Sequence, residues 1–470
     1  MIRVLKSINN SQIAKSGFHY FIGKIANKAQ AFIAIPIFTR LLTPEDYGIV
    51  SVYLSIYSVM IVVSTLNLTS GIGRYYYEKA TDFNQFLGVN VLFICFCAFL
   101  SGSLLLLGAN QLSHWLQIPV NLFYLMAIAL FFELFRTIYD RVLIITRSSK
   151  EYTILSSLTS YTGLGLSAGL IIYFTVDLYF YRLIGVVVAM MLSVFYSVYK
   201  LRRYVDFTKL SISHIKYNFN FSLPLLPYAL SGVLLGTIDR AILNSLTNAT
   251  ETGLYSLAYN VGLLLMAGIV ASNQAFIPNF FEWMNSANFS KIRSSQSKIM
   301  LVITLMGIGL IYFSPQIVYI LADKSFHGAI NLIPVIAGGY LLFAVANLGN
   351  HYFQYYKRTG VLAVVNITAG VLNVALNFIF IPEYGKVAAA WTTLVSFLFL
   401  AITNQMMLKS LFGRNTLSLS IYKPSIIIFS VAILGYFFID IIDNSIIQLL
   451  LLVSIYITLV IFCLKKYGKY

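Results

Sequence analysis

The chain has 470 residues, of which 59% are hydrophobic and only 10% are charged. A soluble domain is nearer one half apolar and one quarter charged, so this composition excludes a soluble protein and indicates an integral membrane protein. The formal net charge is +16, but Lys and Arg occur in twos and threes between apolar runs and form no basic domain. We therefore predict no nucleic-acid partner.

Apolar runs long enough for a transmembrane helix follow one another along the whole chain. About fourteen are expected by length, and the predicted fold class is an all-α integral membrane protein. Lys24 and Lys28 interrupt the first run, which lacks a cleavage signal and is expected to remain. The runs are residues 18–38, 47–68, 86–107, 120–145, 154–176, 179–199, 221–243, 253–277, 299–321, 329–352, 362–381, 387–407, 421–439 and 446–464.

The basic residues between these runs predict the orientation of the helices. With the N-terminus in the cytoplasm, most Lys and Arg outside the helices fall on the cytoplasmic side. A missed helix would disrupt this alternation, so the count and the orientation support each other. We expect a multi-pass protein with the N-terminus and the C-terminus cytoplasmic. The segments assigned to the outer side hold Arg40, Arg182, Lys324 and Lys386.

The hairpin between the first two runs, FTRLLTPEDYGIVS (38–51), is unusually polar, and its features recur later in the chain. Pro44 stops one helix, and Thr43 or Asp46 can cap the next. GIVSVYLSIY (48–57) aligns with GLYSLAYNVG (253–262), and Arg40 aligns with Arg240. An internal repeat of six helices is therefore predicted, with both copies facing the same way because six is even. The predicted domains are an N-lobe over 1–209, a C-lobe over 210–410 and an extra helix pair over 411–470.

Basic side chains within the apolar runs are candidate substrate ligands, because intramembrane charge marks a functional cavity by default. Lys24 and Lys28 share one face of the first helix, and Arg240 repeats Arg40. A wet cavity that receives an anion would tolerate them. Snorkelling of the lysines to the inner surface, and a hairpin-positioning role for the arginines, are the structural alternatives.

Acidic side chains within the runs are candidate ion-coupling groups. Glu133, Arg136 and Asp140 form one stripe on the fourth helix, which is either a structural ion ladder or a site where Arg136 meets an anion while a carboxylate exchanges H⁺ or Na⁺. Asp239 and Arg240 are adjacent and are predicted to point in different directions. The substrate-binding candidates are Lys24, Lys28, Arg40, Arg136 and Arg240, and the ion-coupling candidates are Glu133, Asp140 and Asp239.

Other polar residues give no catalytic pattern. Asn366, Asn373 and Asn377 share a helix face, where they bind sugar hydroxyls or, more commonly, form interhelical hydrogen bonds. The sequence has no Walker A or HExxH motif, so we predict a transporter and not an enzyme, with no cofactor and no metal. Transport would be driven by an ion gradient, by substrate flux or by a partner.

Three segments, taken together, resemble the polysaccharide transporter (O-antigen flippase) family. That family belongs to the multidrug/oligosaccharidyl-lipid/polysaccharide exporter superfamily. The segments are IPIFTRLLTPEDYGIVSVYLSI (35–56), IDRAIL (238–243) with ETGLYSLAYNVG (251–262), and NITAGVLNVALNFIFIPEYGKVAAAWTTLVSF (366–397).

The resemblance implies two six-helix lobes in a V-shaped bundle and alternating access in the cytoplasmic (inner) membrane. The implied substrate is an undecaprenyl-pyrophosphate-linked oligosaccharide of an O-antigen, a capsule or an exopolysaccharide, with cation antiport proposed for the family. Lys24, Lys28 and Arg240 match the implied cationic cavity, and Arg40 matches the outer-hairpin arginine. Two helices beyond the usual twelve depart from the family pattern. Membrane lipids, a polysaccharide polymerase and a chain-length regulator are further candidate partners.

Two alternatives stay open. A cation-coupled drug or small-molecule antiporter of the same superfamily should have an acidic cavity, whereas the intramembrane charges here are positive on balance. A membrane polysaccharide polymerase or transferase usually needs a large outer loop or a catalytic His/Asp set. The predicted outer loops are short, and His114 and His327 are isolated in them.

Overall fold

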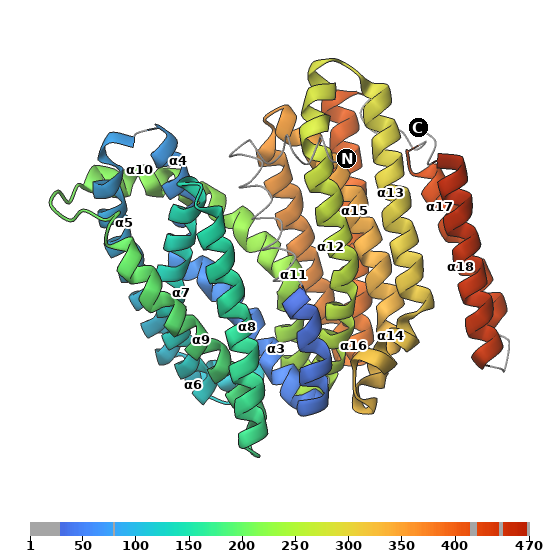
Figure 1. Cartoon of the computed structure of the whole chain (residues 1–470), viewed down its shortest axis with the longest axis horizontal. Coiled ribbons are helices and arrows are strands. Elements are labelled where there is room, and N and C mark those ends of the chain that lie inside the picture. Colours follow the sequence, from blue (N-terminus) through green and yellow to red (C-terminus); the bar gives the residue numbers. More distant parts are fainter. Residues whose placement is uncertain (1–28, 79, 414–420, 441–444, 468–470) are drawn as a thin grey trace. The chain divides into compact units, whose positions relative to one another are not determined.

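The computed structural model of the chain describes residues 29–78, 80–413, 421–440 and 445–467. Within these ranges every secondary-structure element is a helix, which confirms the predicted all-α class (Figure 1). The helices group into two compact units, residues 1–253 and 254–470. The lobe boundaries expected from the repeat stay a prediction.

The first unit opens with a helix over Ala29–Leu41. Its long helices are joined by short helical turns at both ends of the bundle. The elements that follow are α3 (Pro44–Thr65), α4 (Thr69–Glu78), η1 (Ala80–Asp82), α5 (Phe83–Leu107), α6 (Ala109–Leu116), α7 (Asn121–Ile145), α8 (Ser149–Tyr173), α9 (Leu178–Leu201), α10 (Ile212–Ser222), η2 (Leu223–Leu225) and α11 (Leu226–Leu246).

The second unit contains most of α12 (Ala249–Asn285), whose first residues belong to the first unit. Its α15 and α16 are packed along each other. The other elements are α13 (Phe289–Tyr312), α14 (Ser314–Leu321), η3 (Lys324–Leu332), α15 (Ile333–Tyr355), α16 (Thr359–Phe412), α17 (Lys423–Asp440) and α18 (Ser445–Tyr467).

The predicted spans are found in the described helices, except for residues 18–28 of the first span, which lie outside the described residues. Ten of these helices are long and apolar enough to cross a membrane, and shorter apolar helices at Ala29–Leu41, Lys423–Gly435 and Ile447–Cys463 correspond to the first and the last two predicted runs. The long α16 contains two predicted spans, because Gly385 interrupts it with φ 54° and ψ −135°. One run, 299–321, is divided instead: α13 ends at Tyr312, and α14 starts with Pro315 in its first turn.

The polar hairpin before α3 has a local structural cause. Thr43 caps α3, because its Oγ1 accepts a hydrogen bond from the backbone N–H of Asp46 at 3.1 Å. The Asp46 carboxylate accepts in return from the backbone N–H of Thr43 at 3.2 Å, and Pro44 occupies the first helical position. Together these bonds form a capping box, and Thr43 is the cap among the two residues that the sequence offered, Thr43 and Asp46.

Two glycines at equivalent repeat positions form a close helix crossing. A Cβ on Gly48 would lie 2.7 Å from the carbonyl carbon of Ala249, and a Cβ on Gly253 would lie 2.8 Å from the carbonyl carbon of Pro44. Ala249 and Pro44 each precede their own glycine by four residues, so the crossing is nearly symmetric. This symmetry supports the internal repeat. Only residues without a side chain allow helices to approach so closely.

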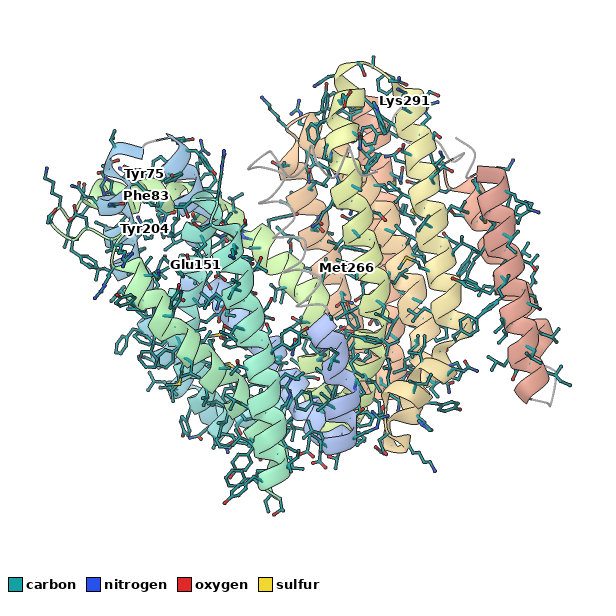
Figure 2. The ribbon with its side chains drawn as sticks, in the orientation of Figure 1. Tyr75, Phe83, Glu151, Tyr204, Met266 and Lys291 are labelled. Carbon is teal, nitrogen blue, oxygen red and sulfur yellow. The ribbon has the colours of Figure 1, made fainter. Side chains whose placement is uncertain are left out.

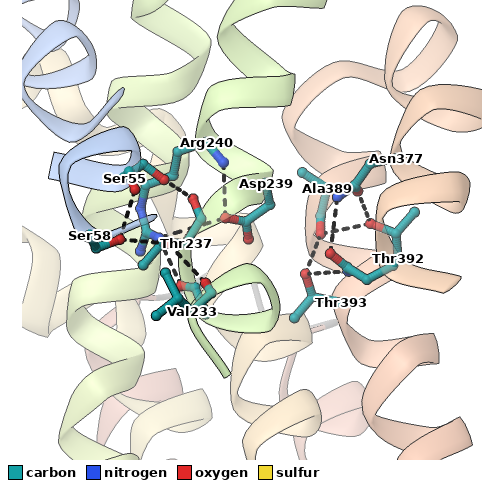
Figure 3. A network of polar contacts seen from close by, with 12 residues as sticks. Ser55, Ser58, Val233, Thr237, Asp239, Arg240, Asn377, Ala389, Thr392 and Thr393 are labelled. Carbon is teal, nitrogen blue, oxygen red and sulfur yellow. Dashed lines mark hydrogen bonds and ion pairs between the residues drawn. The ribbon is translucent and has the colours of Figure 1, made fainter. Parts of the chain in front are cut away.

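In the second unit, the asparagines of α16 form hydrogen bonds across its kink (Figure 3). The Asn377 amide donates to Asn373 Oδ1 at 3.2 Å, and Asn377 Oδ1 accepts from the hydroxyl of Thr392. Asn366 instead donates to the backbone oxygen of Leu362 in its own helix. The interhelical reading of Asn373 and Asn377 is therefore the one that the contacts support.

A cluster at η1 ties the loop after α4 to α10. Asp82 Oδ2 accepts a hydrogen bond from the Tyr75 hydroxyl at 2.8 Å and lies 3.0 Å from His214 Nε2. Tyr75 lies above Phe83 in Figure 2 and stacks on Phe86. The hydrogen bond from Tyr75, and then the contact with His214, lower the pKa of Asp82 from its ordinary value.

This lowered pKa predicts an acid-sensitive contribution to stability. The Asp82 carboxylate should stabilise the fold above the ordinary aspartate pKa of about 3.9 and lose this effect as the pH falls through its lower value in the folded protein. Thermal unfolding of Asp82→Asn in detergent should therefore depend less on pH between about 3 and 5 than that of the parent. Glu383→Gln, at an exposed acid of the other unit, is the control. Parallel pH profiles for the parent and Asp82→Asn would contradict the assignment.

Candidate functional site

Arg136 on α7 is buried and held by two polar partners. Its Nε lies 2.9 Å from Asp140 Oδ1, one turn along the same helix. Its Nη1 donates a hydrogen bond to Thr159 Oγ1 of α8 at 3.0 Å. The predicted stripe thus contains a real ion pair, and α8 completes it. A buried guanidinium held on two sides has a fixed direction, as an anion ligand requires.

Glu133 lies one turn before Arg136 on α7 but has a different hydrogen-bond partner. The Thr137 hydroxyl lies 3.5 Å from Glu133 Oε1 and donates a shorter bond, 2.9 Å, to the backbone oxygen of Glu133. The structure therefore pairs Arg136 with Asp140 rather than with Glu133. Within the described residues, the stripe is an ion pair with a separate carboxyl group beside it, and not a three-membered ladder.

A cavity of about 760 Å³ opens between α8 and α9, beside the α7–α8 turn. Thr159, the partner of Arg136, is one of its lining residues. Arg147 and Lys150 line it at the turn, and Leu158 of α8 and Leu192 of α9 line it further along the helices. The cavity therefore has a basic end and an apolar body, and it reaches the contact that holds Arg136.

Glu151 is the acidic residue among those that line this cavity, and no sequence pattern pointed to its role. Its Oε1 accepts hydrogen bonds from the Tyr139 hydroxyl at 2.6 Å and the Tyr196 hydroxyl at 2.8 Å. The three residues come from α8, α7 and α9, and Figure 2 labels Glu151, which lies in the first turn of α8. Glu151 follows Arg147 and Lys150 closely in the sequence and belongs to no motif that would mark it as a site residue.

Asp239 and Arg240 on α11 are both buried, and their arrangement corrects a prediction (Figure 3). We expected the adjacent side chains to point in different directions. Arg240 Nη1 instead lies 3.6 Å from Asp239 Oδ1 and donates to the backbone oxygen of Gly236 at 3.0 Å. The arginine side chain is long enough to fold back along its helix, so the two charges meet.

Hydroxyl groups join α11 to α3 next to this pair. The Ser55 hydroxyl donates to the backbone oxygen of Thr237, and Ser58 Oγ lies 3.2 Å from Thr237 Oγ1. Small hydroxyl residues allow two helices to pack closely while their polar atoms stay hydrogen-bonded. The packing of α3 on α11 therefore positions the segment that holds Arg240.

The repeated arginines make the same local contact but differ in exposure. Arg40 Nη1 donates to the backbone oxygen of Pro36 at 2.9 Å, as Arg240 does to Gly236. In each case the acceptor lies four residues earlier. Arg40 is exposed, whereas Arg240 is buried. Lys24 and Lys28 lie outside the described residues. Among the residues that are described, no three His, Cys, Asp or Glu side chains gather as metal ligands would.

Comparison with curated proteins finds relatives at low sequence identity. A protein of the Lsg locus of Haemophilus influenzae is 25% identical over 58% of this chain and 66% of its own length. The protein named "Probable low-salt glycan biosynthesis flippase Agl15", of Haloferax volcanii, is 26% identical over 40% of this chain and 41% of its own length. The chain thus spans less than two thirds of the length of these curated relatives.

Solved structures share the fold over most of the chain. The lipid II flippase MurJ, in an inward closed conformation, superposes with a TM-score of 0.75 over 96% of this chain and 99% of its own, at 13% identity. An inward-facing multidrug resistance MATE family transporter gives a TM-score of 0.62 over 82% and 95%, at 16% identity. These likenesses show that the chain has the fold of these membrane proteins.

One family covers more than half of the sequence. The family described as polysaccharide biosynthesis protein matches residues 13–284, which include α3, the α7 ion pair, the cavity and Arg240. The fold agrees with that of the flippase and transporter structures. The sequence resemblance to polysaccharide transporters agrees with the matched family. The chain therefore belongs to the polysaccharide biosynthesis protein family of membrane proteins.

Proposed function

We propose that the chain is a flippase that translocates an undecaprenyl-pyrophosphate-linked oligosaccharide across the cytoplasmic membrane by alternating access. The oligosaccharide would be a repeat unit of an O-antigen, a capsule or an exopolysaccharide. Family membership supports a saccharide substrate, and the flippases among the similar proteins support a lipid-linked one. On this proposal the protein lies in the inner membrane with both termini cytoplasmic, and it supplies a polysaccharide polymerase and its chain-length regulator.

The observation that carries the proposal is the burial of Arg136 and Arg240 within apolar helices. A pyrophosphate lipid head is anionic and cannot enter hydrocarbon without replacing its water. Guanidinium groups bind phosphate oxygens through charge-assisted hydrogen bonds and stay charged at any working pH. An arginine has five N–H donors, and the contacts of Arg136 with Asp140 and Thr159 use those on Nε and Nη1.

Acidic neighbours would allow the substrate to leave. Asp140 and Asp239 lie 2.9 Å and 3.6 Å from the two arginines, so each is placed to compete with a phosphate for the same cation. A conformation that strengthens this pairing would weaken substrate binding. We extend this to Glu133 and propose that these carboxyl groups couple transport to H⁺ or Na⁺ antiport. Transport by purified protein that ignores both gradients would rule out the coupling.

The second candidate is a cation-coupled drug or small-molecule antiporter, which the similarity to a MATE transporter favours. The two functions require opposite charges along the transport pathway. A cationic drug would be repelled by Arg136 and Arg240, whereas an anionic lipid head would be attracted. Efflux of cationic dyes by the wild-type protein, with no change in surface polysaccharide on deletion, would establish the antiporter instead.

The test of the flippase is the lipid-linked intermediate that accumulates in a deletion strain. Mass analysis should find an undecaprenyl-pyrophosphate oligosaccharide, and the intact gene should remove it. Arg240→Ala and Lys28→Ala should restore neither export nor the normal intermediate level while the protein stays in the membrane. Arg202→Ala, which removes a cation stacked on exposed Tyr199, is the control and should export normally. Wild-type surface polysaccharide in both test variants would overturn the cationic-cavity assignment.

A further inference from the structure

The cavity between α8 and α9 has the chemistry of an amphiphile site. Its end at the α7–α8 turn carries Arg147 and Lys150, both exposed, together with Ser148 and Ser149. Two cations beside hydroxyl groups at the end of a transmembrane helix suit a phosphate group at the membrane surface. The cavity volume of about 760 Å³ is within the range that holds a drug-sized ligand.

The body of the cavity is lined by exposed apolar side chains. Ile154, Leu158 and Leu192 line it and are 54%, 61% and 58% exposed. In the most apolar part of α8, only 22% of the residues are buried inside the protein. Exposed leucines and isoleucines on a transmembrane helix lie naturally against acyl chains. A ligand with a phosphate head and a long apolar chain would therefore satisfy both parts of the cavity.

Glu151 makes the polar end more selective than a basic patch. Its Oε1 is bound by the hydroxyls of Tyr139 and Tyr196, which fix the carboxylate among the lining residues. Its Oε2 has no hydrogen-bond partner within the described part of the chain. A carboxylate placed next to two cations would repel a purely anionic head group, but it would accept hydrogen bonds from a primary ammonium.

We propose that this cavity binds a phospholipid with an ethanolamine head group. Arg147 and Lys150 hold the phosphate, Glu151 accepts from the ammonium group, and an acyl chain lies between α8 and α9 along Leu158 and Leu192. The site is separate from the translocated substrate. It contacts the Arg136 ion pair through Thr159, which lines the cavity and accepts the hydrogen bond from Arg136.

Lipid retention by the purified full-length protein tests the site. Native mass spectrometry would be done after incubation with equal amounts of phosphatidylethanolamine, phosphatidylglycerol and phosphatidylcholine of identical acyl chains. Phosphatidylethanolamine should be retained about tenfold over the other two, because only it offers both a phosphate and an ammonium N–H donor (about 1.4 kcal/mol). Equal retention of the three lipids, or a preference for phosphatidylglycerol, would overturn the proposal.

Variants separate the two halves of the head-group contact. Glu151→Gln still accepts from the tyrosines and should remove the preference for phosphatidylethanolamine over phosphatidylglycerol. Arg147→Ala/Lys150→Ala should lower retention of both lipids about tenfold. The matched control is Lys357→Ala/Arg358→Ala, which removes the basic pair at the turn between α15 and α16 and should retain lipid like the parent. Wild-type retention in the Arg147/Lys150 variant would exclude the phosphate site.

A third variant tests the apolar part without changing any charge. Leu158→Trp puts a bulky ring at an exposed lining position, where folding should tolerate it. It should lower phosphatidylethanolamine retention while the thermal unfolding temperature stays close to that of the parent. Unchanged retention would place the acyl chain elsewhere and overturn the site between α8 and α9.

Discussion

Gly48→Ala and Gly253→Ala are each expected to lower the free energy of unfolding by about 3 kcal/mol, the upper end of ordinary overpacking. The added Cβ would meet backbone atoms of the opposing helix, 2.7 Å and 2.8 Å away at Ala249 and Pro44. Backbone cannot rotate aside as a side chain can, so α3 and the start of α12 must separate. Alanine has a helix propensity about 1 kcal/mol more favourable than that of glycine. The expected loss of stability is what remains after this gain is subtracted.

The control is a glycine of the same unit in open space. A Cβ on Gly102 of α5 would meet nothing within 4 Å, so Gly102→Ala should unfold at the parental temperature or slightly above it. Denaturation by heat and by SDS in detergent solution measures all three variants. The double variant Gly48→Ala/Gly253→Ala should lose less than the sum of the single losses, because both methyl groups force the same separation. If Gly48→Ala and Gly253→Ala unfold like Gly102→Ala, the crossing of α3 with the start of α12 has room for a methyl group.

Arg136→Met is expected to lower the free energy of unfolding by about 3–5 kcal/mol, because it leaves the Asp140 carboxylate without its cation inside an apolar helix. Asp140→Leu should have a similar effect, since it leaves the guanidinium of Arg136 without its ion-pair partner. The double variant Arg136→Met/Asp140→Leu should recover most of the stability, because two apolar side chains then replace the pair. Denaturation by SDS would measure the three variants in parallel with the parent.

The double variant also decides what the ion pair is for. If Arg136 contacts the substrate, Arg136→Met/Asp140→Leu should be stable and still fail to export polysaccharide. Full export by the stable double variant would reduce the pair to a structural role. Arg74→Ala is the control. Arg74 and Glu78 are four residues apart, like Arg136 and Asp140, and Arg74 Nε lies 2.6 Å from Glu78 Oε1, but both side chains are exposed. Exposed pairs are screened by solvent, so its effect should be too small to resolve.

The candidate site could be predicted wherever its partners are close in the sequence. Arg136 and Asp140 are one turn apart, so their pairing follows from the helix itself. The same reasoning failed for Asp239 and Arg240, because a rule about Cβ directions ignores the length of an arginine side chain. The partners on other helices could not be predicted from the sequence. Thr159 of α8 contacts Arg136 of α7, and Tyr139 of α7 and Tyr196 of α9 contact Glu151 of α8.

The sequence by itself determined the all-α class and most of the membrane spans. It also predicted a cap at the polar hairpin, at Thr43 or Asp46, and a repeat that relates Gly48 to Gly253. In a bilayer the backbone N–H and C=O groups must be hydrogen-bonded within the helix. Long apolar runs therefore predict the helices, and the polar interruptions between them predict where the helices end. Only the tertiary structure decided which helices touch. The crossing of α3 with the start of α12, the fixing of Glu151 by two tyrosines and the cavity between α8 and α9 depend on contacts between distant segments, which no local pattern encodes.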